Sequence, residues 1–350
     1  MLKKIVLFLL VITIFAACQS DDCSSAPDVS KIEMDLKIKR FDQDLFSLDS
    51  SDMKGSVQKL REKYGDFPDF YFDLLGFLGQ QEPEDSLYNR LNGFTNFRTF
   101  YDTTQLVYGD ISDIEGELSQ SFKYIKHYLP EYELPEIFAM YSEFSNDIIL
   151  PPTGNSCVIS LELFFGQNYE LYSAPEINIP RYISRNLDRA HISSRVISLL
   201  AKDMVEAIHN DTSLATPSKL TTLLDYMILN GKTTYLLDKF MPCTPDSIKL
   251  GYSATQTEWL EKSELSMWRE VFVSKLYDTD YKSFQKYISL SPNSPDMPME
   301  APGNTGSYVG WKIIAAFMER NPNYSIDQML RLNDSQKILK MSKYKPKEVK

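Results

Sequence analysis

The stretch "PGNTGSYVGWKIIAAF", residues 302–317, decides between two kinds of fold, because its glycines could form either a phosphate-binding loop or the start of a helix. A P-loop needs Lys followed by Ser or Thr directly after its last glycine, and a strand before its first. Here Gly306 is followed by Ser307 and Tyr308, Gly310 is followed by Trp311, and a proline-rich stretch precedes them. We therefore exclude a phosphate loop and predict a buried helix over residues 308–319.

The same stretch predicts how this helix begins and packs. Thr305 or Ser307 would supply the capping hydroxyl, while Gly303 and Gly306 allow the chain to turn. Gly310 lies inside the first turns, where a glycine costs about 1 kcal/mol relative to alanine. We therefore expect another element to approach Gly310 closely. The apolar stripe of the helix consists of Val309, Ile313 and Phe317.

Helical periodicity dominates the rest of the chain. Between Ile111 and Leu129 apolar residues recur every three or four positions, which predicts one amphipathic helix ending at Pro130. Ser325 and Gln328 form a capping box at the start of a last helix. Further helices are predicted over 55–64, 84–105, 194–209, 218–229 and 255–277.

Strand signals are confined to the middle of the chain, at residues 136–144, 148–150 and 157–165. The segment "PPTGN" separates the last two stretches and is typical of a turn. We therefore predict an α+β fold, a mostly helical single body with a small central sheet.

The N-terminus has the pattern of a targeting signal. Two lysines precede the apolar run Ile5–Ala17, which is shorter than the roughly 20 residues that span a bilayer but suits a secretory signal. The run ends in Phe15-Ala16-Ala17-Cys18, which resembles a bacterial lipobox. We expect residues 1–17 to be removed and Cys18 to carry the lipid. The alternative is an ordinary signal peptide with an incidental cysteine.

The remaining boundaries follow from composition. We expect a flexible tether over residues 18–31, because they contain almost no apolar side chains. A globular body is predicted over residues 32–341, and a solvated basic tail over residues 342–350. The lipid would hold this body outside the cytoplasm, facing the periplasm or the cell surface. The net charge of −11 repels nucleic acid and anionic lipid headgroups, so nucleic acid is excluded as a partner.

Three cysteines remain beyond Cys18, an odd number that cannot all pair within the chain. Cys157 lies in the apolar run "CVISLELFF" and is expected to be a small buried residue. Pairing of Cys157 with Cys243 is open to the chain in an oxidising compartment, and the third cysteine is Cys23.

The histidines argue against a zinc hydrolase, because the chain has only three and no HExxH. The segment "DMVEAIH" places Asp203, Glu206 and His209 three positions apart on one predicted helix, with a single E-x-x-H. We interpret this helix face as a solvent-exposed ladder in which Lys202 pairs with Glu206. We expect no metal and no cofactor.

Several segments, in order, resemble the gliding-motility lipoprotein GldB family. They are "IKRFDQDLF" (38–46), "KYGDFPDFY" (63–71), "LELFFGQNYELY" (161–172), "LLDYMILNGKTTYLLDKFMP" (223–242) and "GSYVGWKIIAAFMERNP" (306–322). Together with the lipobox they cover nearly the whole mature chain. The resemblance implies a lipoprotein of the gliding machinery.

That family is in turn similar in architecture to predicted zinc metallopeptidases. The resemblance implies that the helix at 194–209 would carry HExxH in such relatives, and that the helix leading into Gly231-Lys232 would offer an acidic third ligand. This chain departs at both places, with His209 alone and with Asn230 before Gly231. A metallopeptidase-like architecture would therefore hold a degenerate site. The alternative is that the likeness reflects helix packing alone.

Two functions follow. The preferred one is a lipid-anchored, non-catalytic component of the motility machinery that binds other envelope proteins, with Tyr308, Trp311 or the acidic helices presenting the contact face. The alternative is an extracytoplasmic hydrolase or peptidase with an unrecognised site.

Overall fold

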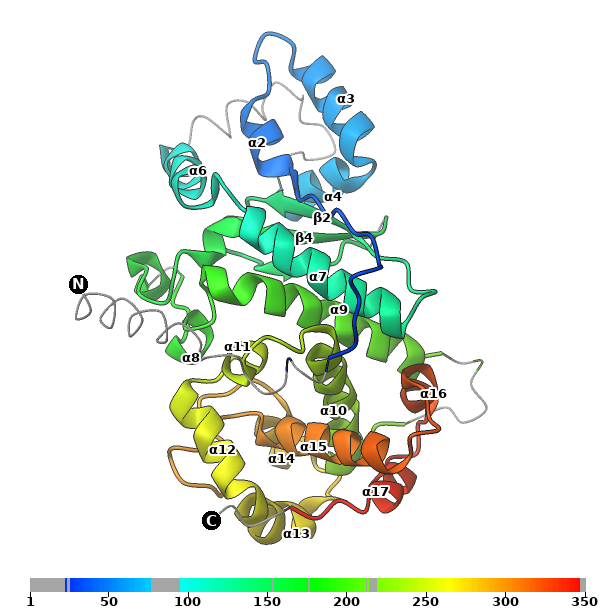
Figure 1. Ribbon diagram of the computed structural model, residues 1–350. Coiled ribbons are helices and arrows are strands. Elements are labelled where there is room, and N and C mark those ends of the chain that lie inside the picture. Colours follow the sequence, from blue (N-terminus) through cyan, green and yellow to red (C-terminus); the bar gives the residue numbers. More distant parts are fainter. Residues whose placement is uncertain are drawn as a thin grey trace, which may run out of the picture.

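A four-stranded mixed sheet lies near the middle of the molecule in the computed structural model, which describes residues 23, 26–76, 95–152, 154–175, 177–211, 213 and 219–346 (Figure 1). The strand order is β1 (Lys39–Arg40), β2 (Glu136–Met140), β4 (Ser156–Ser160) and β3 (Ile148–Ile149). The first three strands run parallel, and β3 pairs antiparallel with β4.

The two faces of the sheet are covered by different helices because side chains alternate along each strand. Ile137 and Ala139 of β2 join the core under α7 (Ser112–Tyr128) and α9 (Ile192–His209). Phe138 and Met140 join a second, largely aromatic core. That core is closed by α2 (Phe41–Phe46), α3 (Met53–Tyr64) and α4 (Phe67–Leu74), and α6 (Thr95–Tyr108) lies beside it (Figure 1).

The C-terminal half forms a helical layer on the far side of α9 from the sheet (Figure 1). It contains α10 (Leu223–Phe240), α11 (Asp246–Leu250), α12 (Ala254–Ser266), α13 (Val273–Lys275), α14 (Tyr281–Ile288), α15 (Thr305–Arg320), α16 (Ile326–Arg331) and α17 (Ser335–Ser342). A π-helical turn, Met267–Phe272, joins α12 to α13. The short α8 (Arg181–Ser184) and three 3₁₀ turns (Leu161–Phe164, Glu170–Ser173 and Arg189–His191) connect β4 to α9.

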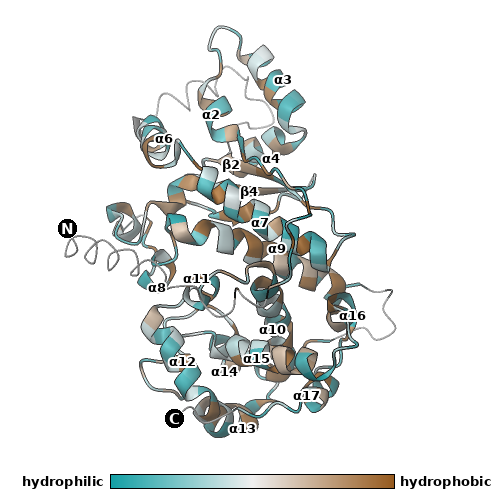
Figure 2. Ribbon diagram, viewed as in Figure 1, coloured by the Kyte–Doolittle hydropathy of each residue, from teal (hydrophilic) through white to brown (hydrophobic). Residues whose placement is uncertain are grey.

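Burial follows the position of each helix. In Figure 2 the central α9 is mostly hydrophobic and the outer α12 mostly hydrophilic, and α12 buries only Leu260. No helix among the described residues is both long and apolar enough to cross a membrane.

The mostly helical α+β fold is confirmed, as are the helices predicted at 111–129, 194–209 and 308–319. The capping box of Ser325 and Gln328 is also confirmed. The helix predicted at 218–229 instead runs from Leu223 to Phe240, through Asn230 and Gly231. Residues 84–94 of another predicted helix lie outside the described residues.

The predicted strands are too long. The chain leaves β2 after Met140, and both Glu143 and Phe144 then adopt positive φ angles, 55° and 60°. The strand expected at 157–165 ends at Ser160 and continues as a 3₁₀ turn.

The cap of α15 also differs from the expectation. The N-cap residue is Asn304, in the left-handed region with φ 64°, and not Thr305 or Ser307. The Thr305 hydroxyl lies 2.7 Å from Ser294 Oγ, while Ser307 Oγ donates to Asn304 Oδ1. Thr305 and Ser307 are the first and third residues of the helix, so neither occupies the N-cap position.

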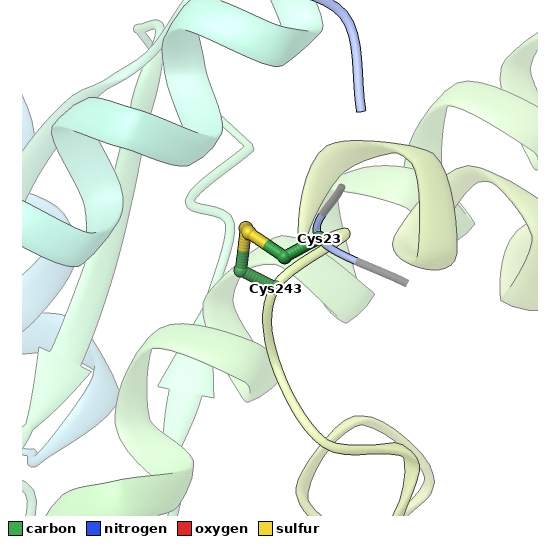
Figure 3. The surroundings of a disulfide bond; sticks show 2 residues. All are labelled: Cys23 and Cys243. Carbon is green, nitrogen blue, oxygen red and sulfur yellow. A yellow bond between two sulfur atoms is a disulfide. The ribbon is translucent and has the colours of Figure 1, made fainter. Parts of the chain in front are cut away.

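The disulfide joins Cys23 to Cys243, so the pairing of Cys157 with Cys243 that the sequence left open does not form (Figure 3). Cys157 is a free thiol with no exposed surface, as expected of a small core residue. The predicted tether is held at two points, because Cys23 is cross-linked and Val29 is 4% exposed. Cys18 lies outside the described residues.

The predicted basic tail also contacts the body. Tyr344 donates a hydrogen bond from its hydroxyl to Glu264 Oε1 (2.7 Å) and packs edge-on against Trp268. The tail is therefore not wholly solvated.

Candidate functional site

Of the residues expected at a degenerate metal site, Asp203, Glu206 and His209 lie on α9 and Asn230 lies on α10. Asp203 and Glu206 are exposed on α9, and Lys202 Nζ lies 3.8 Å from Glu206 Oε1. This confirms the predicted pairing of Lys202 with Glu206. Among the described residues no group of three His, Cys, Asp or Glu side chains could hold a metal ion.

His209, at the end of α9, borders a small hollow between α9, α10 and α17. Its neighbours there include Asp225 and Lys232. Burial and the nearby Lys232 charge lower the pKa of His209. Lys232 Nζ donates to the carbonyl oxygens of Leu330 and Leu332 at 2.9 and 3.0 Å, and burial lowers its pKa to about 8. These two hydrogen bonds join α10 to the C-terminal end of α16.

Asn230 serves a different part of the structure. Its Nδ2 donates to the carbonyl oxygen of Ile288 and to Ser307 Oγ, both at 2.8 Å. It therefore ties α10 to the end of α14 and the start of α15, and it borders a different hollow from His209.

The glycines singled out from the sequence meet where α10 crosses α15. A Cβ on Gly231 would overlap the backbone of Gly310, and a Cβ on Gly310 would overlap the backbone of Met227. A Cβ on Gly306 would lie 2.7 Å from the carbonyl oxygen of Tyr287. The helices α10 and α15 can approach this closely only because Gly231 and Gly310 lack side chains, whereas Gly306 lies against α14.

Tyr308 and Trp311 do not present a contact face, because they are only 3% and 6% exposed. The Tyr308 hydroxyl and the Trp311 indole nitrogen are buried and have no hydrogen-bond partner among the described residues. Lys312 Nζ lies 4.0 Å from the centre of a Trp311 ring, within the range of a cation–π interaction.

A polar cleft of about 320 Å³ lies between α9, α10, the loop after α14 and the start of α15. Its charged and titratable lining residues are His191, Arg195, Lys202 and Lys249, and none of the described side chains that line it is acidic. Carboxylates lie just outside the wall, since Asp188 binds His191 and Asp147 binds Arg195. Arg195 Nε has no partner among the described residues. This cleft is the candidate binding site of the molecule.

Hydroxyl and amide groups fill much of the remaining wall of this polar cleft. They come from Asn186, Ser194, Ser198, Asn230, Thr233, Thr234, Ser289, Asn304 and Ser307. A wall of hydrogen-bonding groups with basic residues suits an anionic, polar ligand better than an apolar one.

Glu162 is a buried carboxylic acid that the sequence did not single out. It follows β4, has no exposed surface, and accepts hydrogen bonds on Oε1 from the Ser142 amide (2.7 Å) and hydroxyl (2.8 Å). Its Oε2 has no partner among the described residues. Burial raises the pKa of Glu162 to about 7. A lone charged residue in the apolar run "CVISLELFF" was the available signal.

Comparison with known proteins gives one match. No curated protein and no solved structure matched the chain. The family model for "Gliding motility protein GldB" matches residues 22–346, which include all five segments noted from the sequence. The chain therefore belongs to the gliding motility protein GldB family.

Proposed function

We propose that this chain is a lipid-anchored, extracytoplasmic component of the gliding motility machinery that binds other envelope proteins and catalyses no reaction. The family match over residues 22–346 carries the proposal. The sequence Phe15-Ala16-Ala17-Cys18, which precedes the matched region by three residues, supports the lipid anchor.

Three contacts support a binding body over a catalytic one. Glu206 is engaged with Lys202 on the surface of α9. Asn230 uses its amide to join α10 to α14 and α15. These roles of Glu206 and Asn230 in surface charge and packing support a binding body.

The polar cleft supports recognition of an acidic segment of a partner. Its basic side chains on α9 and its lack of acidic lining residues favour a negatively charged ligand, although the chain as a whole has a net charge of −11. Lys202 is the most accessible of these groups, since its side chain is 59% exposed.

The anchor is tested by Cys18→Ala in cells that glide, with Gln19→Ala as the matched control. We expect Cys18→Ala to lose acyl labelling, to leave the membrane fraction or remain uncleaved, and to impair gliding, while Gln19→Ala behaves as the wild type. An unacylated Cys18→Ala protein that supports full gliding would contradict the anchored role. Normal gliding in a deletion strain would contradict the motility role itself.

The cleft is tested separately by charge reversal. Lys202→Glu should impair gliding at normal protein abundance, and Lys282→Glu, at an exposed lysine of α14, should not. Equal gliding in both variants would remove the cleft from the proposal and leave the anchor unaffected.

A further inference from the structure

The Cys23–Cys243 disulfide, shown in Figure 3, attaches the chain to the body close to the proposed lipid site. Cys23 is five positions after Cys18, and five residues span at most roughly 18 Å when fully extended. Without the disulfide, the first buried residue of the body would be Val29, eleven positions after Cys18, at most roughly 40 Å along the chain. The cross-link thus about halves the reach of the anchor.

We infer that the surface around Cys243 faces the membrane that holds the lipid and contacts its phospholipid headgroups. This inference rests on the proposed lipidation of Cys18. We call this region the anchor-side surface and define it by two adjoining hollows of about 220 and 770 Å³. The smaller includes Ala26, Pro27 and Pro242, which are close in sequence to the two cysteines.

The larger hollow continues from the smaller one along α15 to the C-terminal segment. The two share Asp238, Lys239, Trp311 and Lys312, so they form one continuous region. The region lies across α10 from the polar cleft, because Tyr235 and Lys239 border it while Asn230 and Thr234 border the cleft.

The anchor-side surface has a higher proportion of basic residues than the whole chain, and this suits contact with phospholipid headgroups. Its five basic residues are Lys239, Lys312, Arg320, Lys343 and Lys345, and its four acidic residues are Asp238, Asp246, Glu264 and Glu319. The chain as a whole has 37 basic and 48 acidic residues. A basic side chain near a membrane is attracted to anionic headgroups, and an acidic one is repelled.

Three of the four carboxylates already have partners within the protein. Asp238 and Asp246 both bind Lys249 Nζ, at 2.6 and 2.9 Å, and Glu264 accepts the Tyr344 hydroxyl. Lys343 and Lys345 are exposed. The short anchor and the local charge therefore favour the same orientation, with the more acidic remainder of the body turned away from the bilayer.

Photocrosslinking of the full lipidated protein in vesicles tests this orientation. The vesicles contain phosphatidylethanolamine and phosphatidylglycerol that carry an alkyne tag. Benzoylphenylalanine replaces Lys239 on the anchor-side surface or, as the matched control, Lys282 on α14. Lys282 is exposed, and the chain directly after α14 borders the polar cleft across α10. We expect several-fold more lipid adduct at position 239 than at 282.

Breaking the disulfide supplies a second comparison. Cys23→Ser lengthens the free chain and should reduce the excess of adduct at position 239, with unfolding curves confirming that the variant is folded. Mass analysis of the N-terminal peptide reports the acyl group independently. Equal adduct at 239 and 282 in acylated protein overturns the orientation alone, whereas a peptide without acyl chains overturns both the anchor and the orientation.

Discussion

Gly310 of α15 lies directly against the backbone of Met227 in α10, so closely that a Cβ on Gly310 would overlap the Met227 carbonyl group. The partner position on α10 is Gly231, one helical turn after Met227, whose own Cβ would overlap Gly310. The crossing of the two longest helices in the C-terminal layer is therefore a contact between backbones.

This contact predicts that Gly310→Ala destabilises the fold. Alanine gains about 1 kcal/mol of helix propensity, but an added methyl group against a rigid backbone forces the helices apart. We expect the free energy of unfolding to fall by about 1–3 kcal/mol, the usual cost of overpacking. Denaturant unfolding followed by circular dichroism measures the change.

Gly116 on α7 provides the matched control. It is also a helical glycine, but it is exposed and nothing lies within 4 Å of where its Cβ would be. Gly116→Ala should therefore stabilise the protein by up to about 1 kcal/mol. If Gly310→Ala gave the same gain, the close contact with Met227 would be wrong.

The disulfide predicts the pattern of thiol reactivity. In protein unfolded without reductant, Cys157 should be the only one of Cys23, Cys157 and Cys243 to react with a maleimide, and the Cys23 and Cys243 peptides should remain joined. Cys23→Ser should lower stability by about 2–5 kcal/mol, as loss of a native cross-link usually does. A Cys157–Cys243 peptide in the digest would contradict the pairing.

The described residues hold no group of three His, Cys, Asp or Glu side chains that could bind a metal ion, and from this we predict that zinc does not affect the protein. We expect purified protein to hold no stoichiometric transition metal and His209→Ala to glide normally, because Asn230 borders a separate hollow and Glu206 pairs with Lys202. Elemental analysis and a chelator titration of the melting temperature measure this. About one zinc per chain, with chelation lowering the melting temperature, would restore a metal site.

Helices were predicted correctly where the evidence for them lies within a few neighbouring residues. The apolar spacing from Ile111 to Leu129 predicted α7, and the Ser325 capping box predicted α16. The predicted end of α10, at residue 229, was wrong because the pair Asn230-Gly231 is typical of the end of a helix. In the structure Gly231 lies inside the helix because α15 passes against it, and that tertiary contact has no local signature.

The candidate site was less predictable for the same reason. The polar cleft combines side chains from α9, α10 and the start of α15, which are far apart in the sequence. Cysteine pairing cannot be deduced from spacing alone, and Cys23 lay in a segment whose composition indicated a flexible tether. Gly310 was the one tertiary contact that the sequence predicted. A glycine inside a helix lowers helix stability, and this cost indicated a close contact with another element.

Glu162 predicts how the free energy of unfolding depends on pH, and this effect comes from its burial and not from surface charge. Its pKa is raised from 4.5 to about 7 by burial, so between these values the folded state holds a proton that the unfolded state releases. The stability that this group contributes is therefore fully present below pH 4.5 and is lost as the pH rises to 7, by about 3 kcal/mol in total.

Glu162→Gln should remove this dependence, because an amide keeps the acceptor for Ser142 and cannot ionise. The difference in unfolding free energy between Glu162→Gln and the wild type should shift in favour of the variant from pH 4.5 to 7. It should then stay constant above pH 7, because the carboxyl group is by then ionised in both states. Glu170→Gln, at an exposed carboxylate, controls for the loss of one negative charge. Parallel pH profiles for wild type and Glu162→Gln would show that Glu162 is ionised throughout, and that its Oε2 has access to water or a cation.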